Sequence, residues 1–191
     1  MACIGRMLLS ALVLAALHSV ALAQVPATQI VTLYGLTFPP AVADAERLGV
    51  REYEKDNPGL GYSVGYRQPD AVATVYIYDL KQRDIPDDPS APAIKAQFAA
   101  ASADIFRTQQ QGVYLKVESR GEFSMTDARG RTRLLCATFW LTRTTGEFAS
   151  DLCVGAWNNK FVKFRITGQQ QSQAEAQRFL QAWVDLLWPP R

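Results

Sequence analysis

The chain has 191 residues, 48% of them hydrophobic, and its 20 basic and 18 acidic residues give a formal charge of +2. This length is sufficient for one domain with a real hydrophobic core. A nearly neutral chain has no strong electrostatic footprint for DNA or RNA, so we expect no nucleic-acid partner.

The first 23 residues have the pattern of a secretory signal peptide. Arg6 is their only charge, Met7–Leu17 is a nearly continuous apolar run, and Ala21-Leu22-Ala23 is a small-x-small cleavage site. The run is shorter than the roughly 20 residues that span a membrane. We therefore expect cleavage before Gln24, no stable membrane anchor afterwards, and a single periplasmic or secreted domain over residues 24–191. An uncleaved N-terminal anchor is the alternative.

The one histidine of the chain, His18, lies inside this predicted leader. A mature protein without histidine excludes Ser-His-Asp and Cys-His catalysis and the usual zinc and copper sites. Asp84, Asp87 and Asp88 lie close together in a proline-rich loop, but they lack the Asp-x-Asp-x-Asp-Gly pattern of a calcium loop. The sequence therefore predicts no metal and no cofactor.

The first half of the mature chain is predicted to form strands. Gln29–Phe38 alternates in hydrophobicity and is followed by two prolines. Val42–Glu54 fits either a helix or a strand, and the strong turn Asp56-Asn57-Pro58-Gly59 favours a strand over its later part. Gly61–Tyr66 and Val72–Asp79 are typical strands, because β-branched and aromatic residues alternate along them.

Four tyrosines on these last two strands are candidate binding residues, namely Tyr62, Tyr66, Tyr76 and Tyr78. Their concentration on adjacent strands makes a binding surface one interpretation. The favoured interpretation is that they are ordinary amphipathic sheet residues whose hydroxyls reach the rim of the sheet, because tyrosine is a common strand residue.

Two helices are predicted. The first runs from an N-cap at Ser90 to about Gln111. Its apolar stripe consists of Ile94, Phe98, Ala101 and Ile105. Gln97 falls outside this stripe and is expected to face solvent. The second helix follows the capping box Ser172-Gln173-Ala174-Glu175 and carries Trp183 on its buried face.

The region from Arg133 to Thr167 is predicted to form three consecutive antiparallel strands, because β-branched and aromatic residues dominate it and Gly or Asn marks its turns. It follows a long strand, Val113–Met125, with a bulge or kink near Gly121. The order of strands, helix, strands and helix predicts an α+β domain with one antiparallel sheet of about six or seven strands and two main helices.

Cys136 and Cys153 fall on neighbouring strands of this region. In an exported protein a disulfide between them is the expected state, and a redox-active pair is the alternative. If Cys136 lies opposite Cys153, the first turn centres on Thr144-Thr145 and the second on Asn158-Asn159.

That register gives the three strands two apolar faces, and Phe139 and Phe161 lie on the face opposite the cysteines. If both helices cover the cysteine face, the other face is either closed by another element, such as Val42–Tyr53, or open as a binding surface that includes the two phenylalanines. We expect at least partial closure, because so large an exposed apolar patch would cause association.

The order of strands, long helix, three-strand meander and C-terminal helix resembles the PsbP-like α/β/α fold. The segments Gly59-Leu60-Gly61-Tyr62-Ser63-Val64-Gly65-Tyr66 and Ala73-Thr74-Val75-Tyr76-Ile77-Tyr78-Asp79 also resemble uncharacterised exported bacterial proteins. PsbP-like proteins are mostly accessory subunits or binders, so the resemblance implies a non-enzymatic role. A fold does not determine function, and no functional residue is transferred from that family.

The sequence therefore favours a soluble periplasmic or secreted protein that binds an envelope protein or a small ligand without catalysis. The alternative is an envelope hydrolase that works with carboxylates alone, as glycosidases do. Its candidate residues are Asp70, Asp79, Glu118, Glu122 and Asp151. No spacing among these carboxylates selects a catalytic pair.

Overall fold

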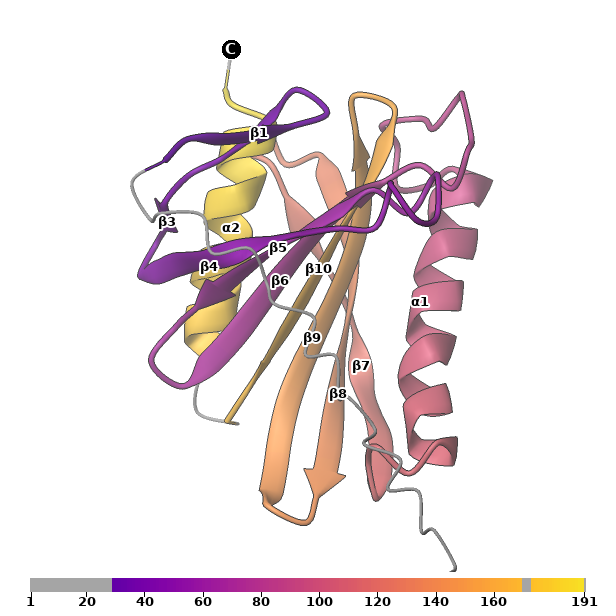
Figure 1. Cartoon of the computed structure of the whole chain (residues 1–191), viewed down its shortest axis with the longest axis vertical. Coiled ribbons are helices and arrows are strands. Elements are labelled where there is room, and N and C mark those ends of the chain that lie inside the picture. The colour runs from indigo at the N-terminus through magenta and orange to yellow at the C-terminus, as the bar shows by residue number, and fades with distance from the viewer. Residues whose placement is uncertain (1–28, 170–172, 191) are drawn as a thin grey trace, which may run out of the picture.

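The computed structural model describes residues 29–169 and 173–190 (Figure 1). The predicted leader, its cleavage site and the N-cap Ser172 lie outside the described residues. The first four strands are β1 (Val31–Leu33), β2 (Leu36–Phe38), β3 (Ala41–Val42) and β4 (Ala45–Glu52). The other strands are β5 (Tyr62–Arg67), β6 (Ala71–Tyr78), β7 (Lys116–Thr126), β8 (Thr132–Arg143), β9 (Gly146–Trp157) and β10 (Lys160–Gly168). The helices are α1 (Pro92–Gln110) and α2 (Gln173–Leu187).

The strands form an antiparallel sheet of eight strands in the order β3-β4-β5-β6-β10-β9-β8-β7, and β1 pairs with β2 in a separate hairpin. The predicted α+β class is confirmed. The sheet is larger than the six or seven strands expected from the sequence, because Val42–Glu54 contributes two strands to it. The expected first strand is instead a hairpin, since Tyr34 and Gly35 both adopt positive φ and reverse the chain.

One helix packs on each face of the sheet (Figure 1). Helix α2 contacts β3 and β7, which are the two outermost strands, and also β9 and β10 between them. The sheet therefore curves around α2. On the opposite face, α1 makes its main contacts with β7, β8 and β9 alone. One helix covers only part of that face, and no cover comes from Val42–Tyr53, which belongs to the sheet itself.

The α2 face is a continuous aromatic and aliphatic core. Trp183 is fully buried, and its ring centroid lies 5.4 Å from that of Phe38 and 5.9 Å from those of Tyr66 and Phe164. The hydroxyl of Tyr66 donates a hydrogen bond of 3.0 Å to the carbonyl of Pro39. This hydrogen bond satisfies the one polar group of a tyrosine that is otherwise enclosed by apolar atoms.

The predicted disulfide is present, and its register is confirmed. Cys136 lies directly opposite Cys153 on β8 and β9, and Phe164 of β10 also lies opposite Cys153. Asn158 and Asn159 both adopt positive φ, as a tight two-residue hairpin turn requires. The bulge predicted in β7 is also present, because the pairing with β8 shifts between Ser119 and Gly121.

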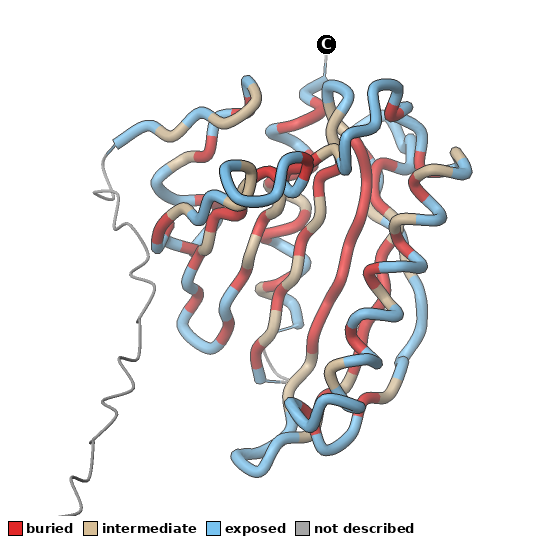
Figure 2. The backbone as a smooth tube through the Cα atoms, turned by 45° about the vertical axis from the view of Figure 1, so that its right-hand side comes forward, coloured by how far each residue is buried: buried red, intermediate tan, exposed pale blue. Residues whose placement is uncertain are grey.

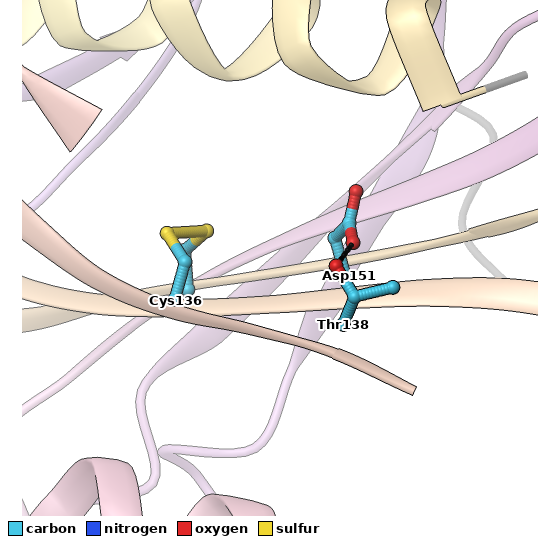
Figure 3. The surroundings of a disulfide bond; sticks show 4 residues. Cys136, Thr138 and Asp151 are labelled. Atoms are coloured by element: carbon cyan, nitrogen blue, oxygen red, sulfur yellow. Dashed lines mark hydrogen bonds between the residues drawn. A yellow bond between two sulfur atoms is a disulfide. The ribbon is translucent and has the colours of Figure 1, made fainter. Parts of the chain in front are cut away.

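Asp151 lies on the same side of the sheet as the disulfide and points toward α2 (Figure 3). Its side chain accepts a hydrogen bond of 2.6 Å from the hydroxyl of Thr138. Burial raises the pKa of this carboxyl, and the hydrogen bond from Thr138 opposes the rise. Asp151 is only 4% exposed, so it is part of the core and not of a surface site.

The other face is closed where α1 covers it. The buried stripe of α1 consists of Ile94, Phe98, Ala101 and Ile105, as predicted. Phe139 and Phe161 are 2% and 1% exposed, and each packs against a neighbouring aromatic ring. Figure 2 shows burial running without a break along the middle of β9, whereas buried and more exposed positions alternate along β4 and β6.

Helix α1 begins differently from the prediction. Ser90 does not cap it, because its hydroxyl donates to the carboxylate of Asp88 instead. The N-cap is Ala91, and Pro92 occupies the first helical position. Proline suits this position, since its φ is already helical and it lacks the N–H that would have no partner there. Within the described residues, no helix is both long and apolar enough to cross a membrane.

Candidate functional site

Helix α1 leaves uncovered the part of its sheet face that is formed by β4, β5, β6 and the adjoining side of β10. We call this surface the open half-face. Strand register places two rows of residues on it. One row consists of Arg51, Ser63, Tyr76 and Lys163, and the next consists of Gly49, Gly65, Thr74 and Arg165.

A cavity of about 340 Å³ lies between α1 and the open half-face, and we call it the α1 groove. Its lining residues are Tyr53, Leu60, Tyr76, Tyr78, Leu80, Gln97, Asp104 and Lys163. Gln97 and Asp104 come from α1, and the others come from the sheet and its loops. The volume falls in the range of roughly 300–1,000 Å³ that is usual for small-molecule sites, and the mixture of apolar walls with a few polar groups is typical of them.

The loop between β4 and β5 forms one rim of the groove. The Glu54 carboxylate accepts hydrogen bonds of 2.9 Å from the backbone N–H groups of both Gly59 and Gly61. The hydrogen bond from Gly61 is the main reason that the pKa of Glu54 is lowered. A side chain at Gly61 would place its Cβ 2.0 Å from the carbonyl oxygen of Ile77, so only glycine fits. This packing fixes Leu60 between the two glycines, where it lines the groove.

The tyrosines supply the polar wall. The hydroxyl of Tyr78 accepts a hydrogen bond of 2.8 Å from the side-chain amide of Gln97, and the hydroxyls of Tyr53 and Ser63 lie 3.3 Å apart. Burial raises the pKa of both Tyr76 and Tyr78. Both phenols therefore stay protonated at neutral pH and can donate a hydrogen bond to a ligand.

Lys163 brings a positive charge to the groove. Its ammonium lies 4.2 Å from the ring centroid of Tyr76 and 5.6 Å from that of Tyr78. Burial lowers the pKa of Lys163, Asp104 opposes this effect, and the charge of Arg165 adds to it. No carboxylate oxygen of the described residues lies within 4.0 Å of the ammonium.

Arg165 is the second cation of this face. Its Nε donates a hydrogen bond of 2.6 Å to the hydroxyl of Ser150, and burial lowers its pKa. Tyr114 lies near Arg165 and opposes this lowering, and the hydroxyl of Tyr114 also accepts a hydrogen bond of 3.1 Å from Arg143. In the part of the chain that the structure describes, Arg165 has no salt bridge either.

The structure separates the six residues that the sequence proposed for binding. Tyr76 and Tyr78 line the groove. Tyr62 and Tyr66 point to the α2 side. Their partners on β6 are Ile77 and Ala73, respectively. Side chains alternate along β6, so these partners face away from Tyr76 and Tyr78. Tyr62 packs edge-on against Tyr34 and is partly exposed.

Tyr66, Phe139 and Phe161 are core residues, so these three binding candidates do not lie at a surface. For the two phenylalanines this agrees with the expected partial closure of their face. Tyr66 is enclosed by α2, and the two phenylalanines belong to the core beneath α1. The interpretation that tyrosines here are ordinary sheet residues therefore describes Tyr66. Tyr76 and Tyr78 remain the candidates with access to a cavity.

Sequence reasoning missed most of the groove. We expect Gln97 to face solvent, because it lies outside the apolar stripe of α1. In the structure its side-chain amide instead donates a hydrogen bond to the hydroxyl of Tyr78. Lys163 and Arg165 alternate with buried apolar residues along β10, which is an inner strand of the sheet. Two cations at such positions were a readable signal, because charges on an inner strand are costly to bury without partners.

The carboxylates proposed for hydrolysis are dispersed. Asp79 pairs with Lys160 at 2.9 Å, and Glu118 pairs with Lys116 at 3.1 Å. Asp151 is buried, Asp70 lies in the turn between β5 and β6, and Glu122 is exposed on β7. The only carboxylate among the described residues that line the groove is Asp104. No cluster of potential metal ligands occurs within residues 29–169 and 173–190.

No protein-family model matches this sequence, and a search of curated proteins finds no significant match. Similar solved structures include a protein of unknown function, PA94, from Pseudomonas aeruginosa, with 14% identity and a TM-score of 0.40 over 85% of this chain and 98% of that one. The cyanobacterial PsbP of Synechocystis has 11% identity and a TM-score of 0.46 over 88% and 92%. The Ran-binding protein Mog1p of Saccharomyces cerevisiae has 13% identity and a TM-score of 0.37 over 87% and 92%. These similarities concern the arrangement of elements alone and assign no function.

Proposed function

We propose that this protein is an exported binding protein without catalytic activity, and that its ligand site is the α1 groove. The observation that supports the proposal most is the cavity itself, about 340 Å³ in volume, with aromatic and aliphatic walls and a small number of convergent polar groups. It lies where the cover by α1 ends and the open half-face begins, within the described residues.

Two features support export. Residues 1–23 have the tripartite pattern of a cleavable leader. The disulfide between Cys136 and Cys153 is a bond that persists in oxidising compartments such as the periplasm. N-terminal sequencing of the exported protein should begin at Gln24, and retention of Met1 would contradict export by cleavage.

The arrangement of acids favours binding over the hydrolase alternative. A glycosidase of the usual kind needs two carboxyl groups that flank the scissile bond, about 5–9.5 Å apart. The groove has Asp104, which is 60% exposed and forms an ion pair with Arg107 of the same helix. No specific observation therefore favours catalysis in this groove.

Binding of N-phenyl-1-naphthylamine, an uncharged aromatic probe whose fluorescence rises in apolar sites, tests the proposed site. The wild-type protein should bind the probe saturably while it remains folded. Leu60→Trp should weaken this binding at least tenfold, because the indole ring would fill the groove that Leu60 lines. Leu186→Trp is the matched control, since Leu186 is exposed on α2, away from the groove. Absence of binding to the wild type, or an equal loss in both variants, would contradict the proposal.

A further inference from the structure

Two partly buried cations, Lys163 and Arg165, lie on the inner strand β10 of the sheet. Lys163 pairs in the sheet with Val154 and Arg165 pairs with Leu152, and both of these β9 neighbours are buried. Withdrawing a charge from water is costly unless a partner of opposite charge or several hydrogen bonds replace the water.

Elsewhere the chain supplies such partners. Lys160, on the same strand, forms a salt bridge of 2.9 Å with Asp79. The buried Arg133 donates to Asp127 at 3.0 Å and to Asp87 at 3.1 Å. Asp104 also lines the groove, but no carboxylate oxygen of the described residues lies within 4.0 Å of the Lys163 ammonium. The lack of a direct ion pair at Lys163 is therefore a local property of the groove and not a general shortage of carboxylates.

The surface beside the groove also carries more basic than acidic residues. Strand register places Arg51 on the open half-face in the row of Lys163, and Arg165 in the next row. Arg67 and its partner Glu46 belong to a third row on the same face. The whole chain carries a formal charge of only +2, so this face has a positive excess that the rest of the molecule does not share. Among the residues that line the groove itself, Lys163 is the cation and Asp104 is the acid, so the positive excess comes from the open half-face beside the groove. An excess of one sign of charge around a concave site attracts ligands of the opposite sign.

We propose that the α1 groove recognises a small molecule with an aromatic or aliphatic body and one anionic group, a carboxylate or a phosphate, and that Lys163, which lines the groove, neutralises that group. Arg165 lies two residues further along β10, outside the lining, and adds positive charge beside the site. This inference rests on the proposed function and specifies its ligand class. Lysine offers three donors and arginine a planar fork, so both suit carboxylate and phosphate oxygens. Leu60, Leu80 and the ring of Tyr53 would contact the body of the ligand.

Three probes with one aromatic frame test the inference, namely 2-naphthoate, 2-naphthyl phosphate and the uncharged 2-naphthamide. Their dissociation constants would be measured by calorimetry or NMR titration on the folded, disulfide-bonded protein. At least one anion should bind about tenfold or more tightly than the amide, because hydrogen bonds between charged groups are stronger than those between neutral groups. The comparison of the two anions identifies the preferred group.

Variants connect this preference to the two cations. Lys163→Met should reduce the ratio of anion to amide affinity to near one, and Arg165→Met should reduce it in the same direction. Lys163→Gln provides a second neutral variant if the first does not fold. Lys116→Met removes the same charge from an exposed site on β7 and should leave the ratio unchanged.

The outcomes separate this inference from the proposed function. If the amide binds in the groove as tightly as both anions, the protein is a binder of uncharged ligands and the inference is wrong. An anion preference that survives Lys163→Met, Lys163→Gln and Arg165→Met would also overturn it. If none of the three probes binds, both the inference and the proposed groove are contradicted.

Discussion

The two faces of the sheet are built for different purposes. On the α2 face, one helix contacts strands at both edges of a sheet that curves around it, and the aromatic core there includes a tyrosine whose hydroxyl is satisfied by the backbone. On the other face, α1 makes its main contacts with β7 to β9, and beside it lie tyrosines and two cations that form no salt bridge among the described residues. The comparison teaches that the face that α2 covers is a closed core, whereas the face on which we propose recognition is only partly covered.

The difference follows from curvature. The concave side of a curved sheet encloses one helix, whereas the convex side is wider than one helix can cover. A second helix on the convex side would complete the cover, but in the described structure α1 reaches β6 at Tyr78, and its main contacts are with β7, β8 and β9. The Cβ direction alternates along every strand, so the same strands present apolar residues to α2 and mixed residues to the groove.

The largest expected effect is on the α2 face. Trp183→Ala should reduce the free energy of unfolding by roughly 3–5 kcal/mol, because it leaves a cavity amid rings that now contact the indole. Urea unfolding measures the loss. Trp140→Ala is the control, because Trp140 is only partly buried and stacks against Arg120. A loss below about 1 kcal/mol for Trp183→Ala would show that this face does not dominate stability.

A smaller loss is expected beneath α1. Phe161→Ser should lower the free energy of unfolding by roughly 3 kcal/mol, since it removes a ring that is 1% exposed and buries a hydroxyl. A thermal melt measures the change, and Phe139→Ser should behave similarly. An unchanged melting midpoint, accompanied by loss of self-association or of partner binding, would instead restore the hypothesis of an open apolar face.

The smallest effects distinguish the paired from the unpaired lysine. Lys160→Met should cost roughly 1–2 kcal/mol, because it leaves the partly buried Asp79 without its ion pair. Lys163→Met should cost nothing measurable or increase stability while it weakens anion binding. Urea unfolding of the two variants in parallel checks the contrast. Equal destabilisation by both substitutions would assign Lys163 a structural role.

The pH dependence of the Lys163→Met effect has a definite sign. Burial lowers the pKa of Lys163 in the folded protein, so the charged form destabilises the fold relative to the unfolded chain. The groups that face this ammonium are Tyr53, Tyr76 and Tyr78 from the sheet, Asp104 and Gln97 from α1, and Arg165 on its own strand. Any stability gained by Lys163→Met should be present in full below the folded pKa. The gain should disappear as pH rises through that pKa toward the ordinary value for lysine.

The sequence predicted the fold better than the site, and particular residues show why. Pairing Cys136 with Cys153 fixed the register of β8, β9 and β10, because a side-chain period of two leaves few alternatives once one pair is placed. The stripe on α1 followed from helical periodicity. Which face of the sheet each helix covers depends on curvature and crossover, which no local pattern records.

The groove brings together residues that are far apart in the chain. Three of its lining residues come from separate elements: Tyr53 follows β4, Gln97 lies on α1 and Lys163 lies on β10. Local sequence patterns predicted each of these elements but could not predict that the three residues lie together. The four tyrosines show the same limit, since the relative register of β5 and β6 decided that two of them face α2 and two face the groove.

The most direct test of the account is an NMR titration of the ¹⁵N-labelled mature protein with 2-naphthoate, compared with 2-naphthamide. The account predicts saturable shifts in the amides of residues 76–78, 97 and 162–166, larger for the anion than for the amide and reduced in Lys163→Met. Amides along α2 should remain unchanged. Shifts confined to the cavity between β7 and α2, which Phe123 and Gln181 line, would contradict it.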